Sequence, residues 1–431
     1  MPQTAAPDRT VADELCRFID DSPSPYHAIA TAAALLEAAG FEEAPLDRAL
    51  PTGAGGRYVR RGGSLIAWRQ PAGAVRSFRI VGAHTDSPNL RIKPRPDHVT
   101  AGVRQLGVEV YGGALLNSWL DRDLGLSGRV SVSTPDGPEL RLVRIDAPLL
   151  RVPQLAIHLD REISTDGLKL NPQTHLAPMW DLDGDRGSGA GFLGLLAERL
   201  DVGAGDILAW DVMAHDLTPS RRTGVDGVFV SAPRLDNLCS SFAGLHGLLD
   251  APEDTPSVPV VCLYDHEEVG STSATGADGA LLASVLERIA LAAGTDRAGL
   301  HAALAGSLCV SADMAHATHP NYADRHEPEH HVALNGGPVV KVNANQRYAS
   351  DAESVGILLQ ACADAGIPTQ RFVTRTDLPC GSTIGPVTAA RLGIPTVDVG
   401  VAQLAMHSAR ELCGADDPSW YVATMAAALQ G

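Results

Sequence analysis

Strands alternate with helices along the second half of this 431-residue chain, and that alternation restricts its fold more than any other feature. From Pro233 onward, apolar spacing predicts these elements in order: helix Leu235–Leu249, strand Val258–Tyr264, helix Leu281–Ala293, strand Leu308–Ser311, helix Ser350–Ala365, strand Thr369–Val373, helix Val387–Leu392 and strand Thr396–Val401. Strands joined through helices pair in parallel, and the helices then cover the sheet. The sequence therefore predicts an α/β fold with a mostly parallel (mixed) sheet and helices on both faces.

The first half of the chain begins in the same way and then changes. Two predicted helices, Thr10–Asp20 and Tyr26–Ala39, precede a strand at Phe78–Ala83. From about residue 97 to residue 232, short runs of alternating polarity are separated by Gly, Pro and Asp, which favours antiparallel β-structure. We therefore predict one discontinuous α/β domain, residues 1–96 and 233–431, split by an inserted β-rich domain over residues 97–232.

Charge and composition exclude several classes of partner. A formal net charge of -17 repels phosphate groups, so we expect no nucleic-acid partner and no docking on membranes. The chain has no run of 18 apolar residues, and its start, MPQTAAPDRTVADELCRF, lacks the basic and apolar regions of a signal peptide. The seven cysteines are scattered and form no CxxC pair, which is typical of a reducing compartment. We expect a cytoplasmic protein.

Side chains that bind metals gather where the predicted strands end. They are His84 and Asp86 after the first strand, Glu267 and Glu268 after Val258–Tyr264, Asp313 and His316 after Leu308–Ser311, His407 after the last strand, and Asp236 at the start of a helix. One such residue alone is usually a loop cap or a solvated surface group. Ligands in open α/β sheets collect outside the carboxyl ends of the strands, and four segments converge on that edge here. The coincidence favours a metal site.

The residue types suit a pair of divalent metals. Two metals about 3.5–4 Å apart need a bridging carboxylate and further ligands on each side, and zinc accepts imidazole and carboxylate. Two histidines and three carboxylates meet that demand: His84, His407, Asp236, Glu268 and Asp313. A metal lowers the pKa of a bound water to about 7, and a general base must then move its proton. Glu267 is the candidate base, although a solvated acidic loop is the alternative explanation for the Glu267–Glu268 pair.

Nine stretches of the sequence resemble the M18 family of metallo-aminopeptidases, the aspartyl aminopeptidases. Seven belong to the predicted α/β domain: AHTDSPNLRIKPRP, RLDNLCSSFAGL, DHEEVGS, SADMAHATHPNY, GPVVKVNANQRYAS, DLPCGSTIGP and VDVGVAQLAMHSARE. Two lie in the predicted insertion: YGGALLNSWLDRDLGLSGRV and QLAIHLDR. The stretches follow the family's order, and the resemblance extends from about residue 10 to the C-terminus.

The resemblance implies a zinc-peptidase-like domain that binds two Zn2+ ions in each subunit. Carried over position by position, it makes Asp236 the ligand that bridges both ions. His84 and Asp313 would hold one zinc, and Glu268 and His407 would hold the other. Carboxylate-rich sites discriminate weakly among divalent metals, so Mn2+ or Co2+ are expected substitutes.

Two acidic neighbours receive supporting roles from the same resemblance. Glu267 would be the general base. Asp86 would orient His84 by accepting its second ring N–H, as carboxylates commonly do for metal-binding histidines.

The resemblance also implies the substrate and the assembly. The substrates would be small peptides with a free N-terminal Asp or Glu, and Lys341 would pair with that side chain, with Tyr348 and His316 nearby. The alternative for Lys341 is an ordinary edge-strand lysine. The inserted domain would mediate dimerisation within a homo-oligomer, a closed tetrahedral dodecamer, in which His158 would reach a neighbouring subunit's active site.

Other functions stay open at this stage. The alternatives are a two-metal aminopeptidase of neutral or broad specificity, a two-metal carboxypeptidase, deacylase or phosphoesterase, and a non-catalytic shell protein that kept the fold. The tract ADRHEPEHHVALN holds His326, His330 and His331, which could form an extra metal site. We favour a plain loop that leads into GPVVKVN.

Overall fold

The computed structural model describes residues 6–184, 191–252 and 255–430, and within them the chain forms two compact units. The first unit extends to residue 86 and resumes over 220–406 and from 411 onward. The second comprises residues 87–219 and 407–410. The short segment belongs with the second unit because Leu115 N–H donates to the carbonyl of His407 (3.0 Å) and Ala409 N–H donates to Ser118 Oγ (2.8 Å).

The units divide the chain elsewhere than the predicted domain boundaries at 96/97 and 232/233, and the domain assignment stays a prediction. The shift at the second boundary has a simple cause. Strands β11 (Arg221–Thr223) and β12 (Phe229–Ala232) lie before residue 233, yet they pair within the first unit. β12 runs antiparallel to β20 (Glu411–Gly414), so residues 221–232 join the first unit through backbone hydrogen bonds.

The first unit is built on a mixed sheet of nine strands among the described residues. In spatial order they are β1 (Glu42–Glu43), β2 (Gly55–Arg61), β3 (Ser64–Gln70), β13 (Val258–Tyr264), β4 (Phe78–His84), β14 (Leu308–Ala312), β18 (Thr396–Gly400), β16 (Val339–Val342) and β17 (Gln370–Val373). The central four, β13, β4, β14 and β18, are parallel, so their carboxyl ends meet at one edge. The predicted mostly parallel sheet is confirmed.

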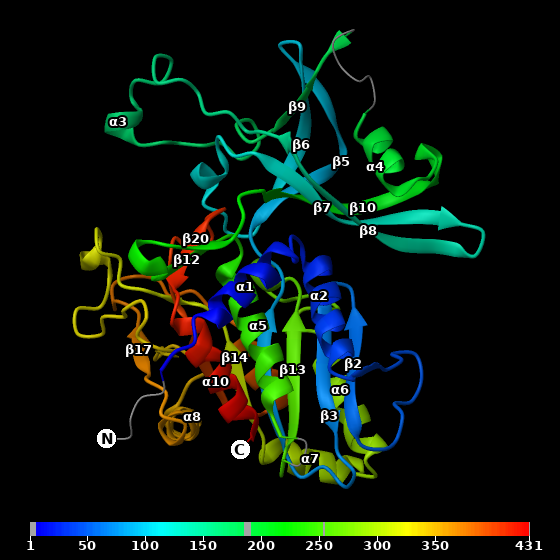
Figure 1. Ribbon diagram of the computed structural model, residues 1–431, viewed down its shortest axis with the longest axis vertical. Helices are drawn as coiled ribbons and strands as arrows, with labels where there is room; N and C mark the ends of the chain where they lie inside the picture. Colours follow the sequence, from blue (N-terminus) through cyan, green and yellow to red (C-terminus); the bar gives the residue numbers. More distant parts are fainter. Residues whose placement is uncertain (1–5, 185–190, 253–254, 431) are drawn as a thin grey trace. The chain divides into compact units, whose positions relative to one another are not determined.

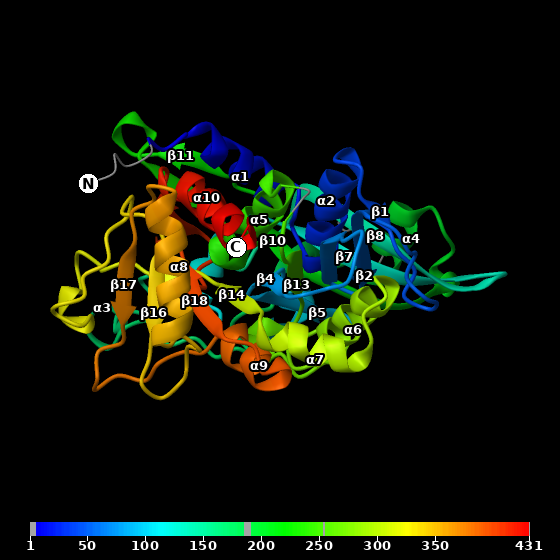
Figure 2. The ribbon, with the colours of Figure 1, turned by 90° about the horizontal axis from the view of Figure 1, so that it is seen from below.

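Helices cover both faces of this sheet (Figures 1 and 2). One face packs on α1 (Thr10–Asp20), α2 (Pro25–Ala38), α5 (Leu235–Asp250), α8 (Ala352–Asp364) and α10 (Asp417–Gln430). The other packs on α6 (Leu281–Ala292), α7 (Arg297–Ala305) and α9 (Ile384–Leu392). Strand β13 shows why both faces are apolar: Val261 and Leu263 point into the first cluster, whereas Val260 and Cys262 point into the second.

Several helices begin at side-chain caps that the sequence supplies. Ser24 accepts the His27 N–H and is followed by a proline at the first position of α2. Asp351 caps α8 in the same way, and Thr383 caps α9. The cap at Thr383 explains why α9 starts at Ile384, three residues before the predicted start at Val387.

A smaller sheet completes the first unit. Its described strands are, in order, β11, β12, β20, β19 (Ala402–Leu404) and β15 (Ala315–His316). The chain leaves the main sheet at the end of β14, passes Asp313 and enters the smaller sheet as β15. There β15 pairs with β19.

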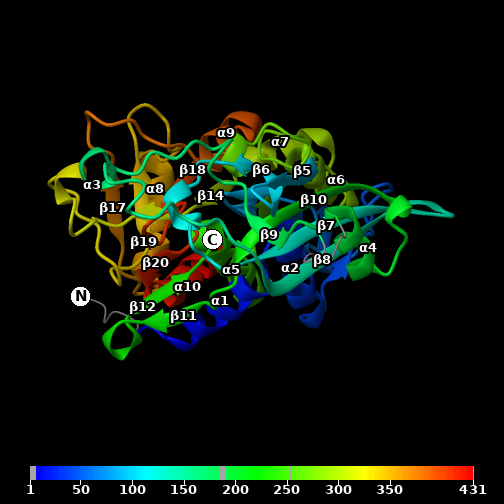
Figure 3. The same cartoon turned by 90° about the horizontal axis from the view of Figure 1, so that it is seen from above.

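The second unit is an antiparallel sheet, as its alternating polarity predicts (Figure 3). Its strands are β8 (Gly137–Leu150), β7 (Leu124–Thr134), β10 (Ile207–Asp216), β5 (Asn89–Thr100), β6 (Val103–Tyr111) and β9 (Met179–Leu182). Helix α4 (Phe192–Leu200) packs on it, with the Phe192 ring 5.3 Å from that of Trp210. The short α3 (Ile163–Asp166) lies in a long connection between β8 and β9.

Neither unit has a described helix long and apolar enough to cross a membrane. All seven cysteines lie in the described residues and carry free thiols.

Replacing Leu263 in the middle of β13 by Ala should lower the free energy of unfolding by about 2–5 kcal/mol, because the side chain is fully buried and its removal leaves a cavity. The matched control is Leu291→Ala on α6, where the leucine is 56% exposed, and it should cost at most about 0.5 kcal/mol. Urea unfolding followed by circular dichroism measures both. Equal effects would contradict the packing described for β13.

Candidate functional site

The carboxyl ends of three parallel strands bring the predicted ligands of the first unit together. His84 is the last residue of β4, Asp313 directly follows β14, and Glu267 and Glu268 lie in the turn after β13. These strands are neighbours in the order β13, β4, β14. Sheet pairing therefore places His84 between the other two segments.

Three donors form a cluster of metal-binding type. One ligand atom each from His84, Asp236 and Glu268 lies within 4.8 Å of the others, and this is the one such group among the described residues. His84 Nε2 is 3.3 Å from Asp236 Oδ1, and both side chains are buried. His326, His330 and His331 form no group of this kind in the part of the chain that the structure describes.

Backbone contacts fix the orientation of the His84 ring. Its Nδ1 lies 2.9 Å from the backbone oxygen of Asp86. A carbonyl oxygen can only accept, so Nδ1 donates to it, and Nε2 is the ring nitrogen left as a ligand atom in the cluster with Asp236 and Glu268. The carboxylate of Asp86 also lies beside Nδ1, at 3.4 Å. Both groups of Asp86 therefore contact the ring, and the predicted role of its side chain in orienting His84 stays a prediction.

The Asp86 carboxylate also supports the turn after β13. It is fully buried, and its two oxygens accept the N–H groups of Glu267 and Glu268, each at 3.1 Å. One side chain therefore fixes the backbone of a metal-binding candidate and of the candidate base together.

Glu267 faces the histidine of the cluster. Its Oε2 lies 3.9 Å from His84 Nε2, and its side chain is 16% exposed. Burial raises the pKa of Glu267 to about 8; His84 opposes this rise, and the carboxylates of Asp313, Asp86 and Asp236 add to it. A bound divalent cation would favour the ionised form, which a general base requires.

Asp313 lies beside a buried lysine. Its Oδ2 is 3.9 Å from the Lys341 ammonium, which donates to the backbone oxygen of Met314 at 3.2 Å. The Lys341 ammonium also lies 5.1 Å from the centre of the Tyr348 ring. Burial raises the pKa of Asp313 to about 6, partly offset by Lys341. His316 is exposed, with its ring 5.8 Å from that of Phe372.

The remaining predicted residues, His407 and His158, belong to the second unit. His407 Nδ1 lies 3.1 Å from the Gly113 carbonyl, so this ring also carries its proton on Nδ1 and leaves Nε2 as a possible ligand atom. His158 is exposed in the connection between β8 and β9. The roles of both residues stay predictions.

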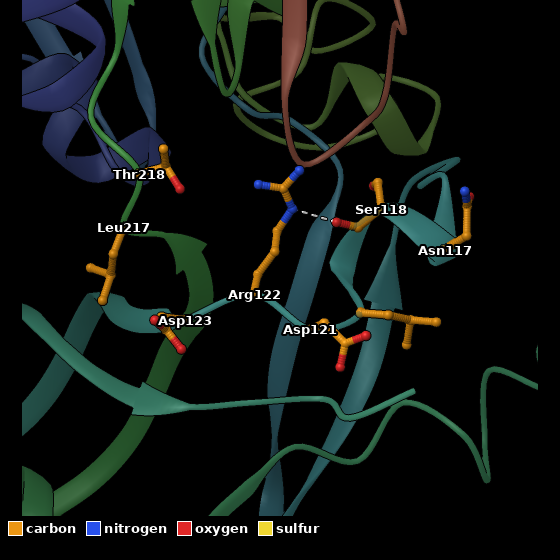
Figure 4. A pocket seen from close by; sticks show the side chains of 8 residues that line it. Asn117, Ser118, Asp121, Arg122, Asp123, Leu217 and Thr218 are labelled. Atoms are coloured by element: carbon orange, nitrogen blue, oxygen red, sulfur yellow. Dashed lines mark hydrogen bonds between the residues drawn. The ribbon is translucent and has the colours of Figure 1, made fainter. Parts of the chain in front are cut away.

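A polar cavity of about 560 Å³ lies in the second unit, and one of its lining residues, Ser118, accepts the Ala409 N–H. Figure 4 shows Arg122 within it, reaching toward Ser118, whose carbonyl accepts from Arg122 Nε at 2.5 Å. Arg410 donates to the carbonyl of Thr218, another lining residue, at 2.5 Å. The second bond ties the Arg410 side chain to the lining of this cavity.

The donors of the first unit fit zinc by their chemistry. One imidazole and two carboxylates whose ligand atoms lie close together are a common zinc-binding set, and Asp236 has two oxygens that could each bind an ion. Although burial lowers the pKa of His84, the carboxylates of Asp236, Asp86 and Glu267 outweigh this effect and raise that pKa well above its ordinary value. The same surplus of negative charge that attracts a proton attracts a divalent cation.

One supporting residue was missed by the sequence analysis. Glu411 is buried on β20, and its Oε2 accepts the backbone N–H of Asp236 at 3.0 Å. It stands in the stretch HSARE, four positions after His407. Its proximity in sequence to a predicted ligand was the one indication available.

Comparison with known proteins identifies close relatives. A family model described as aminopeptidase I zinc metalloprotease (M18) matches residues 18–427. A probable M18 family aminopeptidase 2 from Streptomyces coelicolor is 52% identical over 428 residues, 98% of each chain. The structure of the Ape4 and Nbr1 complex contains a similar chain, with a TM-score of 0.93, 36% identity and coverage of 99% of this chain and 87% of that one. The S. cerevisiae mApe1 dodecamer is similar with a TM-score of 0.84, 27% identity and coverage of 97% and 96%.

Removing the Asp86 carboxylate tests its support of the site. Asp86→Ala should weaken zinc binding by about 10–100-fold, because the Glu267 and Glu268 amides lose their acceptor and the turn is released. Competition with a chromogenic chelator measures the affinity. Asp278→Ala, which removes a surface carboxylate paired with Arg391, is the control and should leave it unchanged. Equal affinities for both variants would refute the supporting role.

Proposed function

Because this chain belongs to the M18 family of zinc aminopeptidases, we propose that it removes N-terminal Asp or Glu from peptides with two zinc ions and Glu267 as the general base. The observation that carries this proposal is the cluster of the buried His84 and Asp236 with the partly buried Glu268, with Glu267 beside it. Asp236 would hold both ions, and Asp313 and His407 would complete the ligand set. Mn2+ or Co2+ would serve as substitutes.

The chain's own residues supply the proton transfers. When bound, the two zinc ions would polarise the scissile carbonyl and lower the pKa of a water to about 7. Glu267 takes a proton from the attacking water as the new C–O bond forms. It then gives that proton to the departing nitrogen as the C–N bond breaks. Asp86 keeps Glu267 in place through the Glu267 N–H.

Lys341 supports the preference for an acidic first residue. A lysine that is only 2% exposed needs a nearby anion, and here the nearest carboxylate belongs to a proposed zinc ligand. The ammonium has three N–H groups, of which one donates to Met314. The others can bind the carboxylate of a substrate Asp or Glu, with Tyr348 beside it. His316 and, from a neighbouring subunit, His158 would border the same pocket.

The assembly is proposed from the relatives. One similar solved structure is a dodecamer, and we infer that this chain also forms a homo-oligomer, built from dimers and closing as a tetrahedral dodecamer. Sedimentation of the purified protein measures its size directly. The free cysteines agree with a cytoplasmic location, which fractionation of expressing cells would test.

Replacing Glu267 by Gln should keep two zinc ions while lowering kcat by about 100- to 10,000-fold, because the amide cannot accept the proton from water. Zinc content by elemental analysis and single-turnover hydrolysis measure the two properties. Glu287→Gln, on the exposed side of α6, is the matched control and should behave as wild type. Normal turnover by Glu267→Gln would overturn the assignment of the base.

Acidic specificity is tested by comparing kcat/KM for peptides that begin with Asp, Glu, Leu or Lys. Wild type should prefer Asp and Glu, and Lys341→Met should lose most of that preference by removing the buried ammonium. Lys169→Met, at a lysine whose side chain is 78% exposed, serves as the control. A wild-type preference for Leu or Lys would exclude the proposed specificity and leave the aminopeptidase assignment intact.

A further inference from the structure

Asp398 is a fully buried carboxylate that neither the ligand set nor the proposed mechanism uses. It lies on β18, in the middle of the main sheet, between the strand that leads to Asp313 and the strand that carries Lys341. Burying a carboxylate is costly unless hydrogen bonds replace its water, so its partners indicate what it stabilises.

Three groups from three separate segments donate to this carboxylate. Oδ1 accepts the hydroxyls of Ser311 (2.6 Å) and Thr383 (2.5 Å), and Oδ2 accepts the backbone N–H of Ala349 (2.6 Å). In return, the Asp398 N–H donates to Ser350 Oγ at 2.9 Å. The segment of Ala349 and Ser350 is therefore attached to β18 twice.

That doubly attached segment directly follows Tyr348, whose side chain is buried. Tyr348 lies against the Lys341 ammonium, and Lys341 is the register partner of Asp398 on the neighbouring strand. The contacts thus run from Asp398 to the Ala349 backbone, to the Tyr348 ring, and to Lys341. They connect a residue outside the proposed ligand set to the wall proposed to receive the substrate's first side chain.

The start of α9, with Gly385 and the capping residue Thr383, comes close to the Asp398 carboxylate. A side chain at Gly385 would place its Cβ 2.3 Å from Asp398 Oδ2, so only glycine lets the start of α9 come this close. Thr383, which caps α9, also donates to Asp398. The Asp398 carboxylate is therefore held by Ser311, Thr383 and Ala349, and its hydrogen bond restricts the position of the Ala349 backbone.

We propose that Asp398 is a positioning residue for the substrate's first side chain: by binding the backbone at Ala349 and Ser350, it holds Tyr348 against Lys341 and so fixes the shape of the pocket. The inference rests on the proposed function in taking Lys341 and Tyr348 as the pocket wall. It does not depend on whether the preferred residue is acidic.

The test compares the substrate that wild type prefers with a peptide beginning with Gly, which has no side chain to place in the pocket. The ratio of the two kcat/KM values measures side-chain recognition alone. Asp398→Leu removes all three acceptor contacts at similar volume and should lower this ratio by about 10-fold or more, mainly through KM. Amide hydrogen exchange should rise around residues 348–350, with exchange at residues 84–86 and 265–268 unchanged.

The conservative variant separates geometry from charge. Asn at position 398 can accept from the Ala349 N–H with its oxygen and donate to the Ser311 and Thr383 hydroxyls with its NH2 group. Asp398→Asn should therefore keep a ratio close to that of wild type. If it lowers the ratio as much as Asp398→Leu does, charge rather than position is responsible and the proposal is overturned.

A second variant covers the case in which Asp398→Leu does not fold. Ser350→Ala removes only the acceptor of the Asp398 N–H and should lower the ratio in the same direction by a smaller factor. Asp20→Ala, which removes a carboxylate that accepts the Ser220 N–H elsewhere in the unit, is the control and should keep the ratio. An unchanged ratio in Ser350→Ala and in Asp398→Leu would overturn the proposal. A wild-type preference for a neutral residue would overturn only the acidic specificity.

Discussion

The geometry of the candidate site depends on the negative charge that is concentrated around His84. Several carboxylates surround this one imidazole at the edge of a sheet, and most are buried. Like charges in a medium of low dielectric repel one another strongly, and each also loses its hydration. Such a cluster is stable only when bound protons or cations compensate its negative charge. The two zinc ions that we propose would supply positive charge and leave Glu267 ionised, as a general base must be.

The cost of assembling these groups explains why their backbones are held so firmly. Asp86 accepts two N–H groups of the turn that carries Glu267 and Glu268. Glu411 accepts the N–H of Asp236 at the start of α5. In both cases a second buried carboxylate fixes the main chain of a proposed ligand through its backbone N–H and not through its side chain. Such supporting carboxylates would hold the proposed ligands in place for a metal ion.

The sequence predicted the central fold well because both faces of the parallel strands are buried. α1 begins and ends at Thr10 and Asp20 as predicted, and β13 has the predicted bounds Val258–Tyr264. The hairpin of β2 and β3 was not foreseen. α10 was missed too, because apolar residues such as Trp420 and Val422 also occupy its less buried side and weaken the contrast between its two faces.

The candidate site was predictable as a set of residues but not as a set of contacts. Strand ends bring His84, Asp313 and the Glu267–Glu268 turn to one edge, and apolar strands that alternate with helices are enough to foresee this. The contact of the Asp86 carbonyl with His84 Nδ1 could not be foreseen, because it depends on the backbone conformation of a turn of two residues. Side-chain contacts across long sequence separations, such as that of Glu411 with Asp236, have no local pattern from which to predict them.

The burial of Lys341 changes how its role is interpreted. Taken from the sequence alone, it could be an ordinary lysine on an edge strand, but β16 lies between β18 and β17, and the side chain is enclosed. Its nearest carboxylate is that of Asp313. If a metal ion binds Asp313, it compensates the negative charge of that carboxylate. The buried Lys341 ammonium then lies beside a cationic centre with less negative charge near it. An acidic side chain entering from the substrate would then relieve this excess of positive charge, which is a physical reason for a peptidase of this design to select Asp and Glu.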